Sequence, residues 1–257
     1  MKNLFSVEGK VVVVTGGSRG IGEMIATGFV HHGARVYVTS RKAEACERVA
    51  RELSKLGDCI ALPFDLSGRD GIQGLVAALG EREARLDVLV NNAGASWGAD
   101  LDDFPESGWD KVLTLNLKSP FFLTQKLLPL LRAAATWEEP ARVINIASVD
   151  GLTTPEFGTY SYSASKAGLI HLTRHLAKHL AKDDILVNAI APGPFESKMM
   201  EWTLENFRDH IVAQNPRRRI GTPEDIAGVS IFLASRASAY TTGCLISCDG
   251  GRAATLY

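Results

Sequence analysis

Cysteine is scarce in this chain, and long apolar runs are missing. The four cysteines, Cys46, Cys59, Cys244 and Cys248, have neither CxxC spacing nor the density of a disulfide scaffold. The first ten residues, MKNLFSVEGK, lack the apolar centre of a secretion signal, and no run approaches the ~18 apolar residues of a membrane-spanning helix. We therefore expect a cytoplasmic protein with free thiols and no membrane segment.

A surplus of charge of one sign is missing as well. The 28 basic and 29 acidic side chains nearly cancel, so no long-range field attracts nucleic acid or an anionic membrane. Repeats, low-complexity tracts and linkers are also absent from the sequence, and 257 residues can bury one large core. We expect residues 1–257 to form a single domain whose partner is a small molecule, with no nucleic acid or membrane partner.

The chain does contain a regular alternation of two kinds of segment. Short runs rich in β-branched residues alternate with longer segments of helical period, which is typical of right-handed crossovers and a parallel sheet. The runs near the middle are apolar almost throughout, as in strands covered on both faces. The sequence predicts a single-domain α/β Rossmann fold, a doubly wound seven-stranded parallel sheet with helices on both faces.

The predicted elements follow from these periods. The strands are predicted at Val11–Thr15, Arg35–Thr39, Cys59–Phe64, Val88–Asn91, Arg142–Ala147, Leu186–Ile190 and Leu245–Ser247. The helices are predicted at about Ile21–His32, Ala43–Leu56, Asp70–Leu79, Trp109–Ala135, Tyr160–Ala181, Met199–Val212 and Pro223–Ala234.

The connection between the first predicted strand and helix, TGGSRGIG, is rich in glycine. Its glycines allow a sharp turn and a close approach to a ligand, and the helix that follows presents unpaired N–H groups at its positive end. A pyrophosphate fits such a site, although the spacing differs from the common G-x-G-x-x-G fingerprint, and an ordinary glycine turn is the alternative. The predicted cofactor-binding residues here are Gly16, Ser18, Arg19, Gly20, Ile21 and Gly22.

Three further motifs follow predicted strands, where open α/β sheets bind ligands. They are FDL after the third strand, NNAG after the fourth and APGP after the sixth. A carboxylate at Asp65 could accept from an adenine amino group, and a turn at Ala93-Gly94 could let a ribose lie flat against the chain. Each motif alone could be a plain loop. Together they predict a dinucleotide crevice lined by Asp65, Leu66, Asn92, Ala93, Gly94, Pro192 and Gly193.

The motif YSASK places Tyr162 and Lys166 four residues apart at the start of a predicted helix. Residues at this spacing share one helix face, although such a pair also arises by chance. The preceding strand is followed by Ser148, which strengthens the case for a site. Because an ammonium group favours phenolate over phenol, we expect Lys166 to lower the pKa of Tyr162 toward neutrality and make it a proton donor or acceptor.

The motifs TGGSRGIG, NNAG, LNL, NIAS, YSASK, APGPFES and CDGG follow one another between about Gly9 and Gly251. With them the sequence resembles the short-chain dehydrogenase/reductases. Within that family it is most similar to 3-oxoacyl-thioester reductases, and NNAGASWGA with GWDKV is similar to the branch associated with rhamnolipid synthesis. The resemblance implies a homo-oligomer, because relatives are commonly tetramers, with a dimer as the alternative.

The resemblance also implies roles for single residues. Tyr162 would be the general acid in carbonyl reduction, Ser148 would hold the carbonyl oxygen and Lys166 would grip the nicotinamide ribose. Asn116 matches the asparagine that positions a water for proton relay. The nicotinamide end would be held by Pro192, Gly193, Phe195 and Ser197.

Two residues depart from the family pattern. Ser197 stands where many relatives have threonine, which keeps the hydroxyl. Asp150 is a charge where a small or apolar residue is common, and this leaves the width of the substrate pocket open.

The end of the second strand indicates which cofactor is bound. A preference for NAD usually comes with an acid that accepts from the ribose 2′-hydroxyl. Here the chain reads Thr39-Ser40-Arg41-Lys42, without an acid, and Arg41 together with Arg19 offers two guanidinium groups to a 2′-phosphate. Two solvated surface arginines are the alternative. We expect NADP, with Ser40 and Arg41 among its binding residues.

The sequence thus predicts NADPH-dependent reduction of a ketone to a secondary alcohol, with a 3-oxoacyl thioester on acyl carrier protein or CoA as the first choice of substrate. A reductase or dehydrogenase for a sugar, steroid or polyketide is the close alternative. A nucleotide-sensing protein without turnover is a third, although such a protein has no need of Ser148, Tyr162 and Lys166 together.

Two further groups of residues stay outside this scheme. His171, His175 and His179 recur every four residues, but they lie ~140° from the face of Lys166, and no metal is expected. The arginines Arg217 to Arg219 could meet an acidic carrier protein or a CoA phosphate, or simply form a solvated surface.

Overall fold

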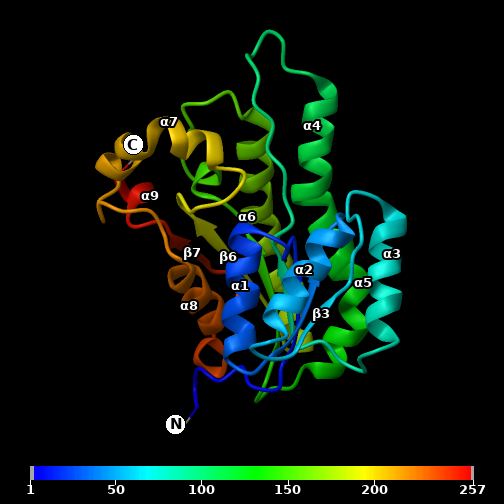
Figure 1. Cartoon of the computed structure of the whole chain (residues 1–257). Coiled ribbons are helices and arrows are strands. Elements are labelled where there is room, and N and C mark those ends of the chain that lie inside the picture. Colours follow the sequence, from blue (N-terminus) through cyan, green and yellow to red (C-terminus); the bar gives the residue numbers. More distant parts are fainter. Residues whose placement is uncertain (1–2, 256–257) are drawn as a thin grey trace.

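One seven-stranded sheet with helices on both faces organises the computed structural model, which describes residues 3–255 (Figure 1). The two residues at each end of the predicted domain 1–257 lie outside the described residues. The strands are β1 Val11–Thr15, β2 Arg35–Thr39, β3 Cys59–Ala61, β4 Val88–Asn91, β5 Ala141–Ile146, β6 Ile185–Pro192 and β7 Leu245–Cys248. The helices are α1 Gly20–His31, α2 Ala43–Leu53, α3 Arg69–Gly80, α4 Glu106–Leu113, α5 Ser119–Ala134, α6 Tyr160–Leu180, α7 Glu201–Gln214, α8 Pro223–Ala234 and α9 Arg252–Thr255.

The strand order is β3-β2-β1-β4-β5-β6-β7, and every pair is parallel. The predicted fold class is therefore confirmed. Because β1 pairs with β2 on one side and β4 on the other, the winding direction of the chain reverses between β1 and β4. A doubly wound sheet opens a crevice for ligands at this reversal, at the carboxyl ends of the strands.

The run of valines in β1 serves both faces of the sheet. Val12 and Val14 pack into one core with α1, α2 and α8, whereas Val11 and Val13 pack into the other with α3, α5 and α6. Side chains alternate between the faces of a strand, so a strand covered on both sides is apolar at every position. The two cores hold the strands in place, and the candidate site is built at the carboxyl ends of these strands.

One predicted element is broken in the structure. The helix predicted at Trp109–Ala135 is α4, a π-helical stretch at Thr114–Lys118 and then α5. Pro120 has no N–H to give the carbonyl four residues earlier, and the helix is widened just before it. Where other boundaries differ from prediction, they differ by one to three residues. The third strand, for example, ends at Ala61, although the Leu62 N–H still donates to the Val38 carbonyl oxygen at 2.9 Å.

No helix within residues 3–255 has the length and hydropathy to cross a membrane. All four cysteines are free thiols.

Candidate active site

The loop between β1 and α1 is too tightly packed for side chains at its glycines. Gly16 and Gly20 have φ values of 66° and 53°, in the left-handed region that favours glycine. A Cβ on Gly22 would lie 2.3 Å from the Gly16 carbonyl oxygen. The loop therefore exposes backbone to a ligand, and the first N–H groups of α1 have no carbonyl partner within the helix. This cradle fits a pyrophosphate.

The remaining predicted residues of this loop differ in exposure. Ser18 is buried, Ile21 is partly buried on the first turn of α1, and Arg19 is exposed immediately before the helix.

Thr15 was not predicted as a site residue, yet it joins two loops of the crevice. Its hydroxyl oxygen accepts the N–H groups of Asn92 and Ala93, each at 2.9 Å, and its hydroxyl lies 3.2 Å from the Val90 carbonyl oxygen. The Asn92 side chain donates to the Thr15 carbonyl oxygen at 2.8 Å. The turn that carries Ala93 and Gly94 is thereby held beside the glycine loop. The only signal in the sequence is a threonine that closes a strand of valines.

The ends of β2 and β3 bring Arg41 and Asp65 to the same edge. Asp65 accepts the N–H and hydroxyl of Ser67 at 3.0 Å and 2.8 Å. These bonds hold the pKa of Asp65 below its usual range, and the positive charge of Arg41 lowers it further. Ser40 is half-buried beside Arg41, which is exposed, and Leu66 is buried. An anion at this edge of the sheet would contact the exposed Arg41 side chain directly.

The connection after β6 lies against the glycine loop. Gly193 donates its N–H to the Cys248 carbonyl oxygen at 3.0 Å, directly after Pro192 ends the strand. Phe195 is buried, and its backbone forms a parallel bridge with Gly221. A Cβ built on Gly20 would lie 2.9 Å from the Cβ of Ser197. Ser197 is therefore close to the predicted pyrophosphate cradle.

Ser148, Tyr162 and Lys166 come together at the carboxyl end of β5. Ser148 begins a short turn in which its hydroxyl oxygen accepts the Asp150 N–H at 3.2 Å. On α6 the Nζ atom of Lys166 lies 5.6 Å from the centre of the Tyr162 ring. Lys166 is buried, and a Cβ built on Gly94 would lie 3.8 Å from its Nζ atom. The predicted catalytic and cofactor loops therefore share one site.

Asn116 lies in the π-helical stretch and is buried. Its side-chain oxygen accepts the Ala95 N–H at 2.8 Å. Its amide nitrogen donates to the Ala95 carbonyl oxygen at 2.9 Å and to the Ser165 hydroxyl at 3.0 Å. The side chain thus fixes the segment after β4 against α6. The predicted role of Asn116 in positioning a water stays a prediction.

The pKa of Tyr162 is opposite to the expectation from the sequence. Burial raises it to about 12, and the hydrogen bond with Ser148 opposes that shift. Burial lowers the pKa of Lys166 to about 8, while Asp150 opposes it. The expected lowering of the Tyr162 pKa is wrong for this geometry, because Lys166 donates to the Ile146 carbonyl oxygen at 2.7 Å and burial dominates. At neutral pH the phenol is protonated and can donate.

The histidines of α6 and Arg219 have other surroundings. His171, His175 and His179 are exposed, and the rings of the last two are 4.9 Å apart. In the part of the chain that the structure describes, no three His, Cys, Asp or Glu side chains gather to hold a metal ion. Arg219 is bound by the Asp225 carboxylate at 2.5 Å.

One family model matches nearly the whole chain, including the loops described above. The family model described as enoyl-(acyl carrier protein) reductase matches residues 16–253. The chain belongs to the short-chain dehydrogenase/reductase family and is an oxidoreductase. The alternative of a nucleotide-sensing protein without turnover is thereby set aside.

This chain is similar to three proteins whose function or structure is named. The rhamnolipids biosynthesis 3-oxoacyl-[acyl-carrier-protein] reductase of Pseudomonas aeruginosa is 51% identical, over 98% of this chain and 99% of that protein. The 3-oxoacyl-[acyl-carrier-protein] reductase FabG of Thermotoga maritima is 37% identical, over 95% of this chain and 98% of its own. The solved RhlG/NADP active-site complex of Pseudomonas aeruginosa superposes with a TM-score of 0.95 at 50% identity, over 98% of this chain and 100% of that one.

Proposed function

We propose that this chain uses NADPH to reduce a 3-oxoacyl thioester, carried by acyl carrier protein or CoA, to the 3-hydroxyacyl form. The observation that carries the proposal is the meeting of Ser148, Tyr162 and Lys166 beside the turn at Ala93-Gly94. Support for the substrate comes from the two relatives named as 3-oxoacyl reductases, and support for NADP from the solved complex.

In this mechanism the cofactor, when bound, would supply the hydride for the carbonyl carbon. The Ser148 hydroxyl donates a hydrogen bond to the carbonyl oxygen and orients it. Tyr162 donates its proton to the same oxygen, since its raised pKa keeps the phenol protonated. While its own amine is protonated, Lys166 places a positive charge near the phenol of Tyr162. Asn116 keeps the segment after β4 in place beside α6.

The cofactor-binding residues follow from the same edge of the sheet. The loop from Gly16 to Gly22 would hold the pyrophosphate, and Arg19 with Arg41 would bind the 2′-phosphate. Asp65 and the turn at Asn92–Gly94 would contact the adenosine half. The segment from Pro192 to Ser197 would hold the nicotinamide end.

We further propose that residues 1–257 act as one domain, in the cytoplasm, as a homotetramer or homodimer. The continuous sheet supports the first point and the four free cysteines the second. The edge strand β7, whose residues are only partly buried, supports the third. Analytical ultracentrifugation measures the assembly directly.

The test of the proposed function is a kinetic comparison. We expect kcat/KM with NADPH to be far higher for a 3-oxoacyl thioester than for free ketones, keto-sugars or keto-steroids, and higher with NADPH than with NADH. A higher kcat/KM for any of the other ketones would contradict the proposed substrate class.

A further inference from the structure

The two connections that follow β5 and β6 expose large apolar side chains. Leu152 and Phe157 on the first are 44% and 48% exposed. Met199, Trp202 and Phe207 on the second are 48%, 61% and 40% exposed. Single exposed apolar residues are ordinary, but a contiguous apolar patch marks a binding surface. The same two connections also carry Ser148 and the predicted nicotinamide-binding segment.

Three aromatic rings join the two connections. The centre of the Phe207 ring lies 6.1 Å from that of Phe157 and 5.7 Å from that of Trp202. We call Phe157, Phe207 and Trp202 the aromatic row. The row links α7 to the loop before α6, and Phe157 is only five residues before Tyr162.

A regular helix would not form this row. Trp202 and Phe207 are five residues apart, which places them ~140° apart around an α-helix. Phe207 has φ −134° and ψ 17°, which are not helical, so α7 is interrupted at this residue. The interruption lets the two rings meet, while Leu204 and Ile211 remain buried. The backbone of α7 is therefore shaped around an exposed aromatic contact.

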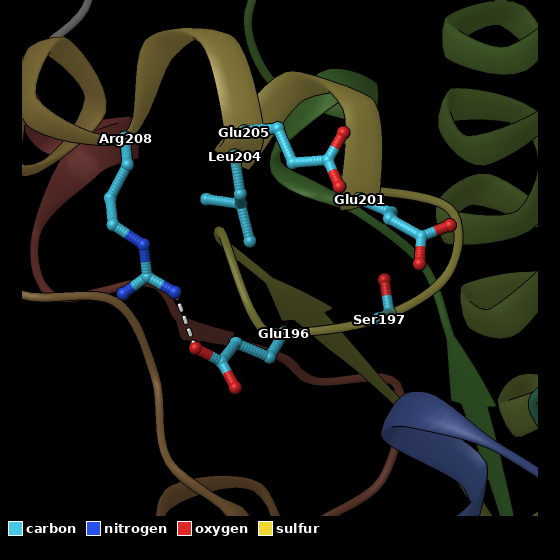
Figure 2. A pocket seen from close by; sticks show the side chains of 6 residues that line it. All are labelled: Glu196, Ser197, Glu201, Leu204, Glu205 and Arg208. Atoms are coloured by element: carbon cyan, nitrogen blue, oxygen red, sulfur yellow. Dashed lines mark hydrogen bonds and ion pairs between the residues drawn. The ribbon is translucent and has the colours of Figure 1, made fainter.

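The cavity between α7 and the connection after β6 is not suited to an apolar ligand. It has a volume of about 350 Å³ and is lined by Glu196, Ser197, Glu201, Leu204, Glu205 and Arg208 (Figure 2). The Arg208 side chain donates to Glu196, one of the three glutamates that line the cavity. Burying an apolar chain there would remove water from the other carboxylates. An apolar part of a substrate is better placed at the aromatic row.

We propose that the aromatic row binds the acyl chain of the substrate and sets a preference for long, unbranched chains. This inference rests on the proposed 3-oxoacyl function, because it assigns the part of the substrate beyond the 3-oxo group. In this proposal the 3-oxo group lies at Tyr162 and a long chain extends along Phe157 to Phe207 and Trp202, which a short chain does not reach. Each methylene group buried there strengthens binding about fourfold.

The experiment measures kcat/KM with NADPH for unbranched 3-oxoacyl-CoA chains of about 4, 8 and 12 carbons. The wild type should show a rise with chain length. Phe207→Ala should lower the ratio of long-chain to short-chain kcat/KM by roughly tenfold or more, since it removes the central ring. Trp202→Ala is the second variant, because its side chain is the most exposed of the three and its loss leaves the core intact.

The matched control is Phe5→Ala, an exposed phenylalanine with one ring contact, 6.4 Å from Phe232. The ratio of long-chain to short-chain kcat/KM in this variant should equal that of the wild type. An unchanged ratio in both Phe207→Ala and Trp202→Ala, or a wild type that does not favour longer chains, overturns the inference. No turnover with any of the thioesters is a different result, which contradicts the proposed function and the inference with it.

Discussion

Lys166 is buried and Tyr162 is partly buried in one site, and the loss of water moves their pKa values in opposite directions. The phenol is shifted to about 12 and the ammonium to about 8, because the loss of water disfavours the charged form of each group. Asp150 raises both values. A residue that departs from the family pattern therefore acts on both titrating groups of the proposed mechanism.

The first prediction concerns Asp150. Asp150→Asn removes a negative charge that favours protonated Lys166 and Tyr162, so both pKa values should fall. The alkaline limb of the kcat/KM profile should then move to lower pH, because Lys166 loses its charge earlier as pH rises. The profile is measured from pH 6 to 10 beside Asp102→Asn, an exposed control. If the alkaline limb of Asp150→Asn lies at the same pH as that of the wild type, Asp150 does not act on the titrating groups of the site.

The second prediction concerns Arg41. Arg41→Asp replaces the proposed partner of the 2′-phosphate with a repelling charge and an acceptor for a 2′-hydroxyl. The ratio of kcat/KM for NADPH to that for NADH should fall by roughly a hundredfold or more. Arg51→Asp, the same charge change at an exposed position of α2, should change the ratio far less. Equal ratios in the two variants would remove Arg41 from the phosphate site.

Among the elements, the glycine loop with the start of α1 depends most on backbone packing. A Cβ on Gly22 would lie 2.3 Å from the Gly16 carbonyl oxygen and 2.4 Å from the Asn92 side-chain nitrogen. Neither atom can move without disturbing the link from Thr15 to the turn after β4.

The third prediction follows from that packing. Gly22→Ala should raise KM for NADPH at least roughly tenfold and destabilise the fold by ~1–3 kcal/mol, as overpacking does. Gly228→Ala in α8 is the control, since a Cβ there meets nothing within 4 Å, and it should stabilise by up to ~1 kcal/mol. Titration of NADPH and thermal unfolding measure both effects. A Gly22→Ala protein with wild-type KM would contradict the assignment of the loop.

Much of the element pattern was predictable because hydrophobic period and turn residues determine it. The strand at Val11–Thr15 and the helix at Pro223–Ala234 have the predicted bounds. The π-helical stretch was not predictable, because the helical period continues through it. The role of Thr15 and the direction of the Tyr162 pKa shift were not predictable either, since both depend on burial and on partners far away in the sequence.

In the whole molecule, parallel strands bring every cofactor motif to one edge, while Arg142 ties the sheet to α8. Arg142 is 1% exposed and donates to the carbonyl oxygens of Leu233 at 3.1 Å, Ser235 at 3.0 Å and Pro140. Its charge thus meets the carbonyl end of α8, where a cation is favoured. Burial lowers its pKa to about 10.

The fourth prediction concerns this link. Arg142→Met keeps much of the volume but removes one donor from each of three buried carbonyl groups, of which those of Leu233 and Ser235 keep bonds from Ser238. It should therefore destabilise the fold by ~1–3 kcal/mol. Arg236→Met, at a half-exposed arginine nearby, should change stability by less than ~1 kcal/mol. Urea unfolding measures both. Equal losses would mean that Arg142 is not the main tie between β5 and α8.

The central claim is that Tyr162 donates the proton in carbonyl reduction, and the most direct measurement is turnover of a 3-oxoacyl thioester by Tyr162→Phe with saturating NADPH. The variant keeps the partly buried ring and removes only the hydroxyl. We predict a fall in kcat of ~10²–10⁴-fold, the usual loss for a general acid, with NADPH affinity little changed. Turnover close to that of the wild type would contradict the account.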